Sequence, residues 1–389
     1  MNIDISPKGF RRVLSGHPWV FQSDVLAAGE AANPGDIVTV KAGNKFVGQA
    51  FYNPHSQITL RMLTRRDEPI DQNFWAARIQ AAWDYRRQFC DPQSCRVVHS
   101  ESDFLPSLIV DKFADVAVLQ SLCLGMDKLK PMIAGLIMDI VGPSSVYERN
   151  DVPVRRLEGM EEATGLLLGA PVPGRVRIEE NGVSLWVDVA HGQKTGYFLD
   201  QKENRAALRP LVKDTKVLDC FCHVGSFALH AGYYGAAEVL GLDISEPSVR
   251  DASENAALNG LSQTCRFETA NVFDYLRAAQ AQGDTYDVVV LDPPAFTKSR
   301  GTVASAERGY KDINLRAMKL LRDRGFLVTC SCSHHMHTDH FLKTIQDAAQ
   351  DAHRTLRLME LRSQGKDHPI LPAAPETQYL KCAIYQVCQ

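Results

Sequence analysis

The chain has 389 residues, of which 45% are hydrophobic and 23% are charged; this composition is typical of globular proteins, and the length indicates two or three domains. No apolar run approaches the roughly 18 residues that a bilayer-spanning helix needs, and residues 1–12 lack the apolar stretch of a signal peptide, so we expect a cytoplasmic protein that does not enter a membrane. The net charge of −3 argues against indiscriminate nucleic-acid binding but allows a local basic patch.

Residues 1–68 are expected to form a small β-barrel, because short strand-like runs alternate with turns rich in Gly, Pro and Asn. The expected strands cover residues 19–21, 37–40, 46–52 and 58–63. Residues 1–66 hold 8 Lys or Arg against 4 Asp or Glu. This excess is either an ordinary solvated surface or a surface for nucleic-acid phosphates. Under the second interpretation, the RNA-binding candidates are Arg11, Arg12, His17, Trp19, Arg61 and Arg65.

Residues 69–174 are expected to form a central α+β domain that carries no recognisable chemistry. Helices are predicted near residues 74–89 and 127–141, and strands near 96–98, 107–110 and 116–119. A turn rich in Pro and Gly at 171–174 marks the end of this domain. The pair Asn181-Gly182 then predicts a type I′ turn within a hairpin, because both residues tolerate positive φ.

From residue 215 onwards, strands and helices alternate regularly, which predicts a doubly wound α/β sheet within a third domain, residues 175–389. The near-continuous apolar run 287–291 is typical of a parallel strand covered on both faces. Ligands of such folds bind beyond the carboxyl ends of the strands. The predicted strands are 216–221, 237–244, 265–272, 286–291, 325–332, 356–362 and 379–387. The predicted helices are 226–234, 246–259, 273–281, 305–322 and 339–352.

Residues 217–226 combine a strand, a tight turn at Gly225 and a helix start, which is a site for a ligand at a helix N-terminus. The single glycine does not match the Gly-x-Gly-x-x-Gly of dinucleotide enzymes, so a pyrophosphate fits poorly and S-adenosylmethionine fits better. Asp219 is placed to pair with its ammonium group. Asp243 follows Gly225 by 18 residues, near the roughly 20-residue spacing of ribose-binding carboxylates; the alternative is a helix N-cap. Asn271 is expected to meet the adenine amino group, or else to be a turn residue.

Two further motifs indicate the reaction. Asp292 follows an apolar strand and precedes two prolines, which fix a stiff turn that can present the carboxylate to a base edge; the alternative is a plain strand terminator. Cys332 ends the next strand and offers a thiolate nucleophile, although Cys330 lies two residues back and would share its face in a strand. We favour Cys332, which is nearer the carboxyl end; a buried thiol is the alternative for either. The 10 cysteines show no Cys-x-x-Cys spacing, so no metal site is expected.

Taken together, these residues resemble the PUA-containing family of large-subunit (23S) ribosomal RNA cytosine-5 methyltransferases over nearly the whole chain. The stretch 193–201 with Arg205 is the most specific match, and in the family it closes over the cofactor. Further matches are 16–21, 33–36, 105–111, 148–151, 310–314 and 367–369. Two departures stand out: Asn271 replaces the usual Asp while keeping an acceptor oxygen, and His334-His335 replaces smaller residues without an assigned role.

The resemblance implies a Rossmann-like class I methyltransferase fold preceded by a PUA-like barrel, with S-adenosylmethionine as cofactor and ribosomal RNA as partner. It also implies that Cys332 is the nucleophile, with Asp292 beside it. A homodimer is compatible with the sequence. The implied cofactor-binding residues are Phe198, Asp200, Gln201, Arg205, Asp219, Cys220, Phe221, Gly225, Asp243, Ile244, Asn271, Val272 and Asp292.

The expected reaction is methyl transfer to carbon 5 of a cytosine through a covalent adduct of Cys332 at carbon 6, after the base has left its stack. A nitrogen-directed RNA methyltransferase, acting on guanine N7 or adenine N6, is the first alternative, and it would leave Cys332 without a function. A non-catalytic RNA-binding or assembly factor is the second, and intact Asp219, Asp243 and Asp292 oppose it. A small-molecule methyltransferase would leave the basic barrel unexplained.

Overall fold

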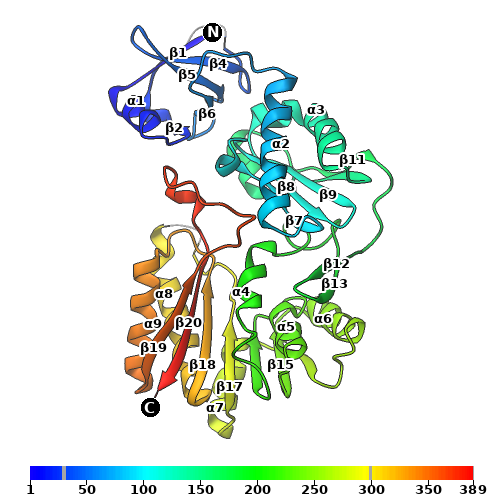
Figure 1. The fold of residues 1–389 in the computed structure, drawn as a ribbon. Helices are drawn as coiled ribbons and strands as arrows, with labels where there is room; N and C mark the ends of the chain where they lie inside the picture. Colours follow the sequence, from blue (N-terminus) through cyan, green and yellow to red (C-terminus); the bar gives the residue numbers. More distant parts are fainter. Residues whose placement is uncertain (29–31, 298–299, 389) are drawn as a thin grey trace. The chain divides into compact units, whose positions relative to one another are not determined.

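The fold is described by a computed structural model that covers residues 1–28, 32–297 and 300–388 (Figure 1). These residues form two compact units. The first comprises residues 1–178, 187–199 and 366–377, and the second comprises residues 179–186, 200–365 and 378–388. The three-domain division at 68/69 and 174/175 stays a prediction. Among the described helices, none combines the length and the apolar character that a membrane crossing requires.

The N-terminal part of the first unit is a sheet of order β2-β6-β5-β4-β1-β3; β2, β4, β5 and β6 agree with the predicted strands, whereas β1 and β3 were not predicted. One helix, α1 (Pro7–Leu14), was not predicted. Ser6 caps it by accepting a hydrogen bond from the N–H of Gly9, and Pro7 occupies its first turn, where no N–H is needed. The strands are β1 (Asn2–Ile5), β2 (Trp19–Val20), β3 (Val25–Ala28), β4 (Ile37–Ala42), β5 (Lys45–Tyr52) and β6 (Leu60–Thr64).

The central part of the first unit is a second sheet, of order β11-β10-β9-β8-β7. The predicted helices are confirmed as α2 (Gln72–Phe89) and α3 (Leu124–Val141), and their buried residues, among them Trp75 and Ile137, join the core of this sheet. The strands are β7 (Ser94–His99), β8 (Leu108–Phe113), β9 (Val116–Ser121), β10 (Ser145–Arg149) and β11 (Thr164–Gly169). Short 3-10 helices include Ser100–Asp103 and Pro153–Glu158.

The predicted hairpin is formed by β12 (Val176–Glu180) and β13 (Val183–Val187). Asn181 and Gly182 have φ angles of 52° and 90°, as a type I′ turn requires.

The second unit contains a sheet of order β16-β15-β14-β17-β18-β20-β19. Neighbours from β16 to β18 are parallel, while β20 runs antiparallel to β18 and to β19. The chain order reverses between β14 and β17, which makes their carboxyl ends the topological switch point. The strands are β14 (Lys216–Cys220), β15 (Glu238–Asp243), β16 (Cys265–Thr269), β17 (Tyr286–Leu291), β18 (Leu321–Ser331), β19 (Thr355–Arg362) and β20 (Lys381–Cys388).

Helices cover this sheet as the predicted doubly wound fold requires. Buried side chains of α7, α8 and α9, such as Leu276, Tyr310 and Phe341, share one core with residues of β14, β17 and β18, and α5 and α6 pack against β14 to β16. The helices are α4 (Lys202–Ala206), α5 (Ser226–Tyr233), α6 (Glu246–Leu258), α7 (Val272–Gln282), α8 (Val303–Leu320) and α9 (Thr338–Ala352).

Candidate active site

The carboxyl ends of neighbouring parallel strands bring the predicted site residues to one edge of the sheet. Asp219 and Asp243 lie in the last two residues of β14 and β15, Asp292 directly follows β17, and Cys332 directly follows β18. The strand order β15-β14-β17-β18 therefore arranges three carboxylates and one thiol around the switch point, where ligands of such sheets bind.

Asp219 is fully buried. Its Oδ2 accepts the N–H of Ala228 at 2.9 Å, while Oδ1 has no hydrogen-bond partner among the described residues. Burial raises the pKa of Asp219 well above its usual value, and the charges of Asp292 and Asp243 raise it further. A buried carboxylate oxygen without a donor favours a cationic ligand, so the site fits the ammonium group of S-adenosylmethionine.

The loop after β14 shapes the ligand-facing backbone. Phe221, His223 and Gly225 have φ angles of 64°, 51° and 82°, and the N–H of His223 donates to Oδ2 of Asp243 at 2.9 Å. A Cβ at Gly225 would lie 2.8 Å from the ring of Phe267. Positive φ and the close approach together explain why glycine occupies this position.

Asp243 does not cap α6, so the alternative interpretation of this residue is wrong. Ser245 is the N-cap and accepts a hydrogen bond from the N–H of Ser248, because it lies directly before the helix. The carboxylate of Asp243 accepts N–H groups of His223 and Ser245 instead. The adjacent Ile244 is 72% exposed, which leaves an apolar surface that the adenine of a cofactor could cover.

Asn271 is the N-cap of α7, because its Oδ1 accepts the N–H of Phe273 at 3.0 Å. Its contact with adenine stays a prediction. The side chains of Cys220 and Val272 are buried in the core that α7, α8 and α9 share with the sheet, and their contact with the cofactor also stays a prediction.

Polar side chains of residues 200–205, at the start of α4, bind other residues of the second unit. Gln201 Nε2 donates to Asp292 Oδ1 at 2.9 Å, and Asp200 Oδ2 accepts the hydroxyl of Tyr379 at 2.6 Å. The buried guanidinium of Arg205 donates to Glu180 at 2.7 Å and offsets that carboxylate, and its contact with the cofactor stays a prediction. Phe198 belongs to the first unit, where Lys194 Nζ lies 4.6 Å from its ring centroid.

The structure separates the two candidate cysteines. Cys330 is fully buried within β18, opposite Cys382 of β20; a hydrogen bond between the two thiols, together with burial, favours the neutral form and raises the pKa of Cys330 well above its usual value. Cys332 is partly exposed, and its Sγ lies 4.0 Å from the carbonyl oxygen of Pro293. Because β18 ends at Ser331, strand alternation does not put the two thiols on one face, which corrects that expectation.

Sequence reasoning missed two groups that hold the Cys332 turn. The buried phenol of Tyr310 accepts from Ser331 Oγ at 2.9 Å and lies 3.0 Å from Ser333 Oγ. Lys381 Nζ donates to the carbonyl oxygen of Ser333 at 2.8 Å. A lysine that opens an otherwise apolar strand was the available sequence signal, because lysine is almost never fully buried without a partner.

The RNA-binding candidates of the barrel divide into exposed and structural residues. Arg61 is only 11% exposed and forms ion pairs with Glu158 and Glu101 at 2.9 and 3.6 Å, and its role in RNA binding stays a prediction. Trp19 also donates to Glu101, at 2.9 Å. Arg12 pairs with Asp24, and His17 with Glu376, whereas Arg11 and Arg65 are exposed.

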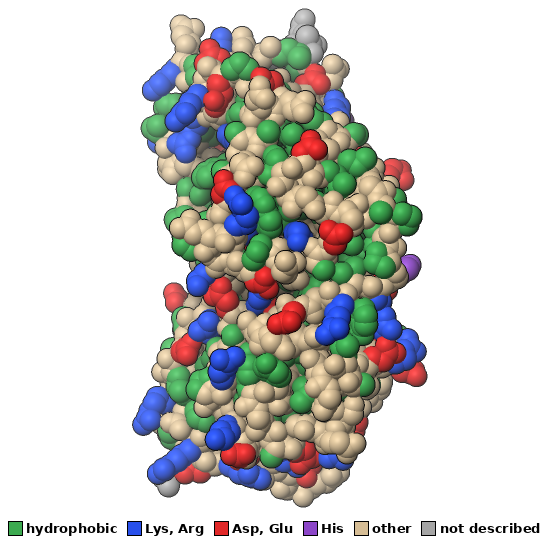
Figure 2. Space-filling view, turned by 45° about the vertical axis from the view of Figure 1, so that its right-hand side comes forward, with side chains coloured by type: hydrophobic (Ala, Val, Ile, Leu, Met, Phe, Trp, Pro, Cys, Tyr) green, Lys and Arg blue, Asp and Glu red, His purple; other side chains and the backbone are tan. Residues whose placement is uncertain are grey.

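A cavity of about 300 Å³ in the first unit is lined in part by basic residues. Two of them, Arg66 and Arg78, were not among the predicted RNA-binding residues. Arg78 lies 4.0 Å from the ring of Phe74, and burial lowers its pKa to about 10. Glu68 and Glu101 supply negative charge to the same lining. Its basic residues are His17, Arg65, Arg66 and Arg78. Figure 2 shows acidic and basic side chains mixed over the visible face, with several Lys and Arg gathered at its upper left.

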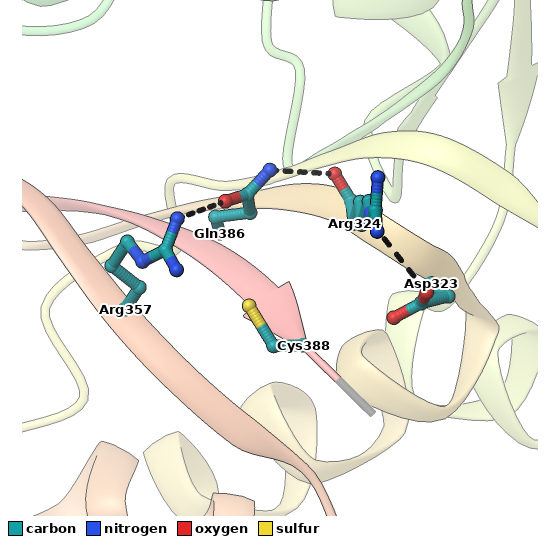
Figure 3. Close-up of a pocket in the computed structure, with 5 residues that line it drawn as sticks. All are labelled: Asp323, Arg324, Arg357, Gln386 and Cys388. Carbon is teal, nitrogen blue, oxygen red and sulfur yellow. Dashed lines mark hydrogen bonds and ion pairs between the residues drawn. The ribbon is translucent and has the colours of Figure 1, made fainter.

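A larger cavity, of about 550 Å³, lies at the opposite end of β18 from Cys332 (Figure 3). Arg357 donates to Gln386 at 3.1 Å, and Gln386 donates to the carbonyl oxygen of Arg324 at 3.4 Å. Since β18 pairs Phe326 with Gln386 and Ser331 with Lys381, this cavity is remote from the switch point and is not the candidate site.

Comparisons by sequence relate the chain to described families. Residues 3–65 match a PUA-like domain, and residues 152–379 match the S-adenosylmethionine-dependent methyltransferases. The ribosomal RNA large subunit methyltransferase I of Alteromonas mediterranea is 38% identical over 389 residues, covering 98% of each chain. The protein of that name from Shewanella denitrificans is 40% identical over 395 residues, covering 100% of this chain and 99% of its own.

By structure, the chain is similar to a protein from Streptococcus mutans that is classed with SAM-dependent methyltransferases. The TM-score is 0.84 at 18% identity, covering 99% of this chain and 100% of the other. At this identity the similarity concerns the fold alone, and it confirms the predicted Rossmann-like methyltransferase fold.

Proposed function

Because the chain belongs to the S-adenosylmethionine-dependent methyltransferase family that includes the ribosomal RNA large subunit methyltransferase I proteins, we propose that it methylates carbon 5 of a cytosine in large-subunit ribosomal RNA. The observation that carries the proposal is the partly exposed Cys332 beside the Asp292-Pro293 turn. An enzyme that methylates a base nitrogen needs no thiol at this point.

The cofactor half of the site is assigned as follows. Asp219 holds the ammonium group of S-adenosylmethionine through Oδ1, and the backbone of residues 221–225 approaches the same end of the cofactor. Asp243 contacts the ribose hydroxyls, while Ile244 and Asn271 lie against the adenine. When bound, S-adenosylmethionine supplies the methyl group as a sulfonium electrophile.

The reaction half belongs to Asp292 and Cys332. Asp292, oriented by Gln201, holds the edge of a cytosine that has left its stack, at a cost of a few kcal/mol. The Cys332 thiolate adds to carbon 6, so that a carbon–sulfur bond forms and carbon 5 becomes nucleophilic. Carbon 5 takes the methyl group, whose bond to the sulfonium sulfur breaks and leaves a neutral thioether. A base then accepts the proton of carbon 5, and the bond between carbon 6 and Cys332 breaks to return the thiolate.

The partner is proposed to be ribosomal RNA, and the location the cytoplasm. Support comes from the relatives' names, and from the basic lining of the 300 Å³ cavity, where Arg65, Arg66 and Arg78 meet. Exposed Arg11 can add a phosphate contact. Arg65 and Arg66 are exposed, so their guanidinium groups can reach a phosphate, whereas Arg61 is held by Glu158 and Glu101.

The test is Cys332→Ala. We expect loss of methyl transfer, by at least a thousandfold, with binding of S-adenosylmethionine unchanged within about twofold. The measurement is 5-methylcytidine in digested large-subunit RNA by mass spectrometry, beside calorimetry with the cofactor.

Cys388→Ala is the matched control, because Cys388 is partly exposed yet lies at the far end of the sheet. Retained 5-methylcytidine formation in Cys332→Ala would remove the thiol from the mechanism. Loss of another methylated nucleoside in its place would identify a nitrogen target.

A further inference from the structure

The turn Ser331-Cys332-Ser333 is held from two sides by buried polar groups that the reaction scheme does not use. We propose that Lys381 is a positioning residue that keeps a positive charge beside the Cys332 thiolate, while Tyr310 fixes the turn that presents the thiol. This inference rests on the proposed function only in that Cys332 is taken as the nucleophile.

Lys381 is fixed in place by the backbone. It pairs with Ser331 across the β18–β20 ladder, and its Nζ donates to the carbonyl oxygens of Ser333 and Tyr379, each at 2.8 Å. The residue is 4% exposed. Two of its three N–H groups are thus committed to carbonyls on either side of the turn, and the ammonium cannot swing away into solvent.

Lys381 lacks the usual carboxylate partner. Among the residues that the structure describes, no Asp or Glu lies within ion-pair distance of its Nζ, and two neutral carbonyl groups accept its hydrogen bonds instead. Burial lowers the pKa of Lys381 to about 8, and the opposing influence is the charge of Cys332. A buried ammonium whose charged neighbour is a thiol stabilises the thiolate form of that thiol.

Tyr310 explains why Cys332 is partly exposed while the serines on both sides of it are buried. Its phenol oxygen lies between the hydroxyl groups of Ser331 and Ser333, so both serines are turned into the core while Cys332 stays partly exposed. The ring packs against Phe296 and Phe341 at centroid distances of 4.7 and 5.6 Å. Burial raises the pKa of Tyr310, so the phenol remains protonated and adds no charge to the site.

The titratable groups around this turn come from several elements. Tyr310 is on α8, Asp292 follows β17, Lys381 opens β20, and Tyr379 precedes it with its ring 5.6 Å from that of His334. The carboxylate of Asp292 opposes formation of a thiolate nearby, and it also acts on buried Cys330. Lys381 therefore supplies a positive charge that offsets the negative charge of Asp292 at the thiol. The carboxylate of Asp292 itself is needed to hold the cytosine edge.

The experiment measures alkylation of Cys332 by iodoacetamide in the full chain, from about pH 6 to pH 10, by peptide mass spectrometry. Lys381→Gln should raise the pH midpoint by about one unit, which makes alkylation near pH 7 about tenfold slower. Lys381→Arg keeps a cation and should restore most of the rate. Cys90 and Cys388, both partly exposed, report in the same digest whether the fold has changed.

An unchanged midpoint in Lys381→Gln would overturn the proposal. If that variant does not fold, Lys381→Met removes the charge with an apolar side chain of similar length. Its pH midpoint of alkylation then decides the proposal in the same way. Because alkylation needs neither RNA nor cofactor, the result is independent of the proposed function. A shifted midpoint together with full methylation by Cys332→Ala would retain the Lys381 assignment and reject the cytosine-5 reaction.

Discussion

Asp219 illustrates how a single side chain ties the fold to the cofactor. Its position before the glycine turn was predictable from the pattern of strand, turn and helix. Its full burial and the lack of a donor to Oδ1 were not predictable, because they depend on how α5 packs on β14. The raised pKa follows from that burial, with Asp292 and Asp243 nearby.

The protonation of Asp219 makes cofactor binding depend on pH. A cation favours the ionised carboxylate, so S-adenosylmethionine affinity should increase as the pH rises toward the raised pKa of Asp219 in the free protein, and should level off above it. Asp219→Asn should weaken binding by at least tenfold, about 1.4 kcal/mol, and remove this pH dependence. Calorimetry across pH checks both.

Asp274→Asn makes the same chemical change at an exposed position on α7 and should leave the pH profile as it is. A pH-dependent affinity that persists in Asp219→Asn would place the titrating group elsewhere.

At the level of residues, the sequence located the site but not each side chain's environment. Cys332 and the carboxylates at strand ends followed from chain position alone. The sequence favoured Cys332 over Cys330 because Cys332 is nearer the carboxyl end, but the burial of Cys330, Cys220 and Val272 depends on how the helices cover the sheet. The ion pairs of Arg61 and Arg205 were not predictable, because their buried carboxylate partners, Glu158 and Glu180, are distant in sequence.

Among the elements, the loop 221–225 is under the strictest backbone constraint. Three of its five residues, Phe221, His223 and Gly225, have positive φ angles, and Gly225 lies against Phe267. Gly225→Ala combines a strained φ with a clash. We expect it to lower the free energy of unfolding by about 2 kcal/mol or more and to weaken cofactor binding, as measured by denaturant titration and calorimetry.

Gly260 provides the comparison for Gly225, because its φ is 69° while no atom lies within 4 Å of the point that a Cβ would occupy. Gly260→Ala should show the conformational strain alone, about 1–2 kcal/mol. Equal effects of the two substitutions would mean that the contact with Phe267 relaxes and does not shape the loop.

The predicted elements agree best where the pattern is periodic and regular. Every predicted strand and helix after residue 215 has a counterpart, and β17 has the predicted bounds. The first unit agrees less well: α1, β1, β3, β10 and β11 were missed. β1 and β3 have four residues each and α1 has eight, while β11 is a largely exposed edge strand with two glycines, so these segments are short or carry a weak pattern.

At the scale of the whole molecule, the near-neutral charge balance leaves RNA affinity to a few local groups. Replacing Arg65, Arg66 and Arg78 together by Ala should flatten the dependence of RNA affinity on salt by about two in the log–log slope, if each arginine neutralises one phosphate. Filter binding of a large-subunit RNA fragment at several salt concentrations measures this slope.

Arg266, Arg277 and Arg324 are exposed arginines of the second unit and form the matched control set. An equal loss of slope in the control set would indicate diffuse attraction by the surface, without a role for the cavity of the first unit.

The buried cluster around Glu158 has a mechanical consequence. This carboxylate accepts hydrogen bonds from Asn53, Ser56 and Arg61 of the barrel, while Glu158 itself closes a 3-10 helix after β10. These hydrogen bonds therefore join the barrel to the central part of the first unit through buried side chains. When RNA docks on the barrel, the protein therefore loses little further orientational freedom, because folding has already removed it. This preorganisation lowers the entropic cost of binding RNA.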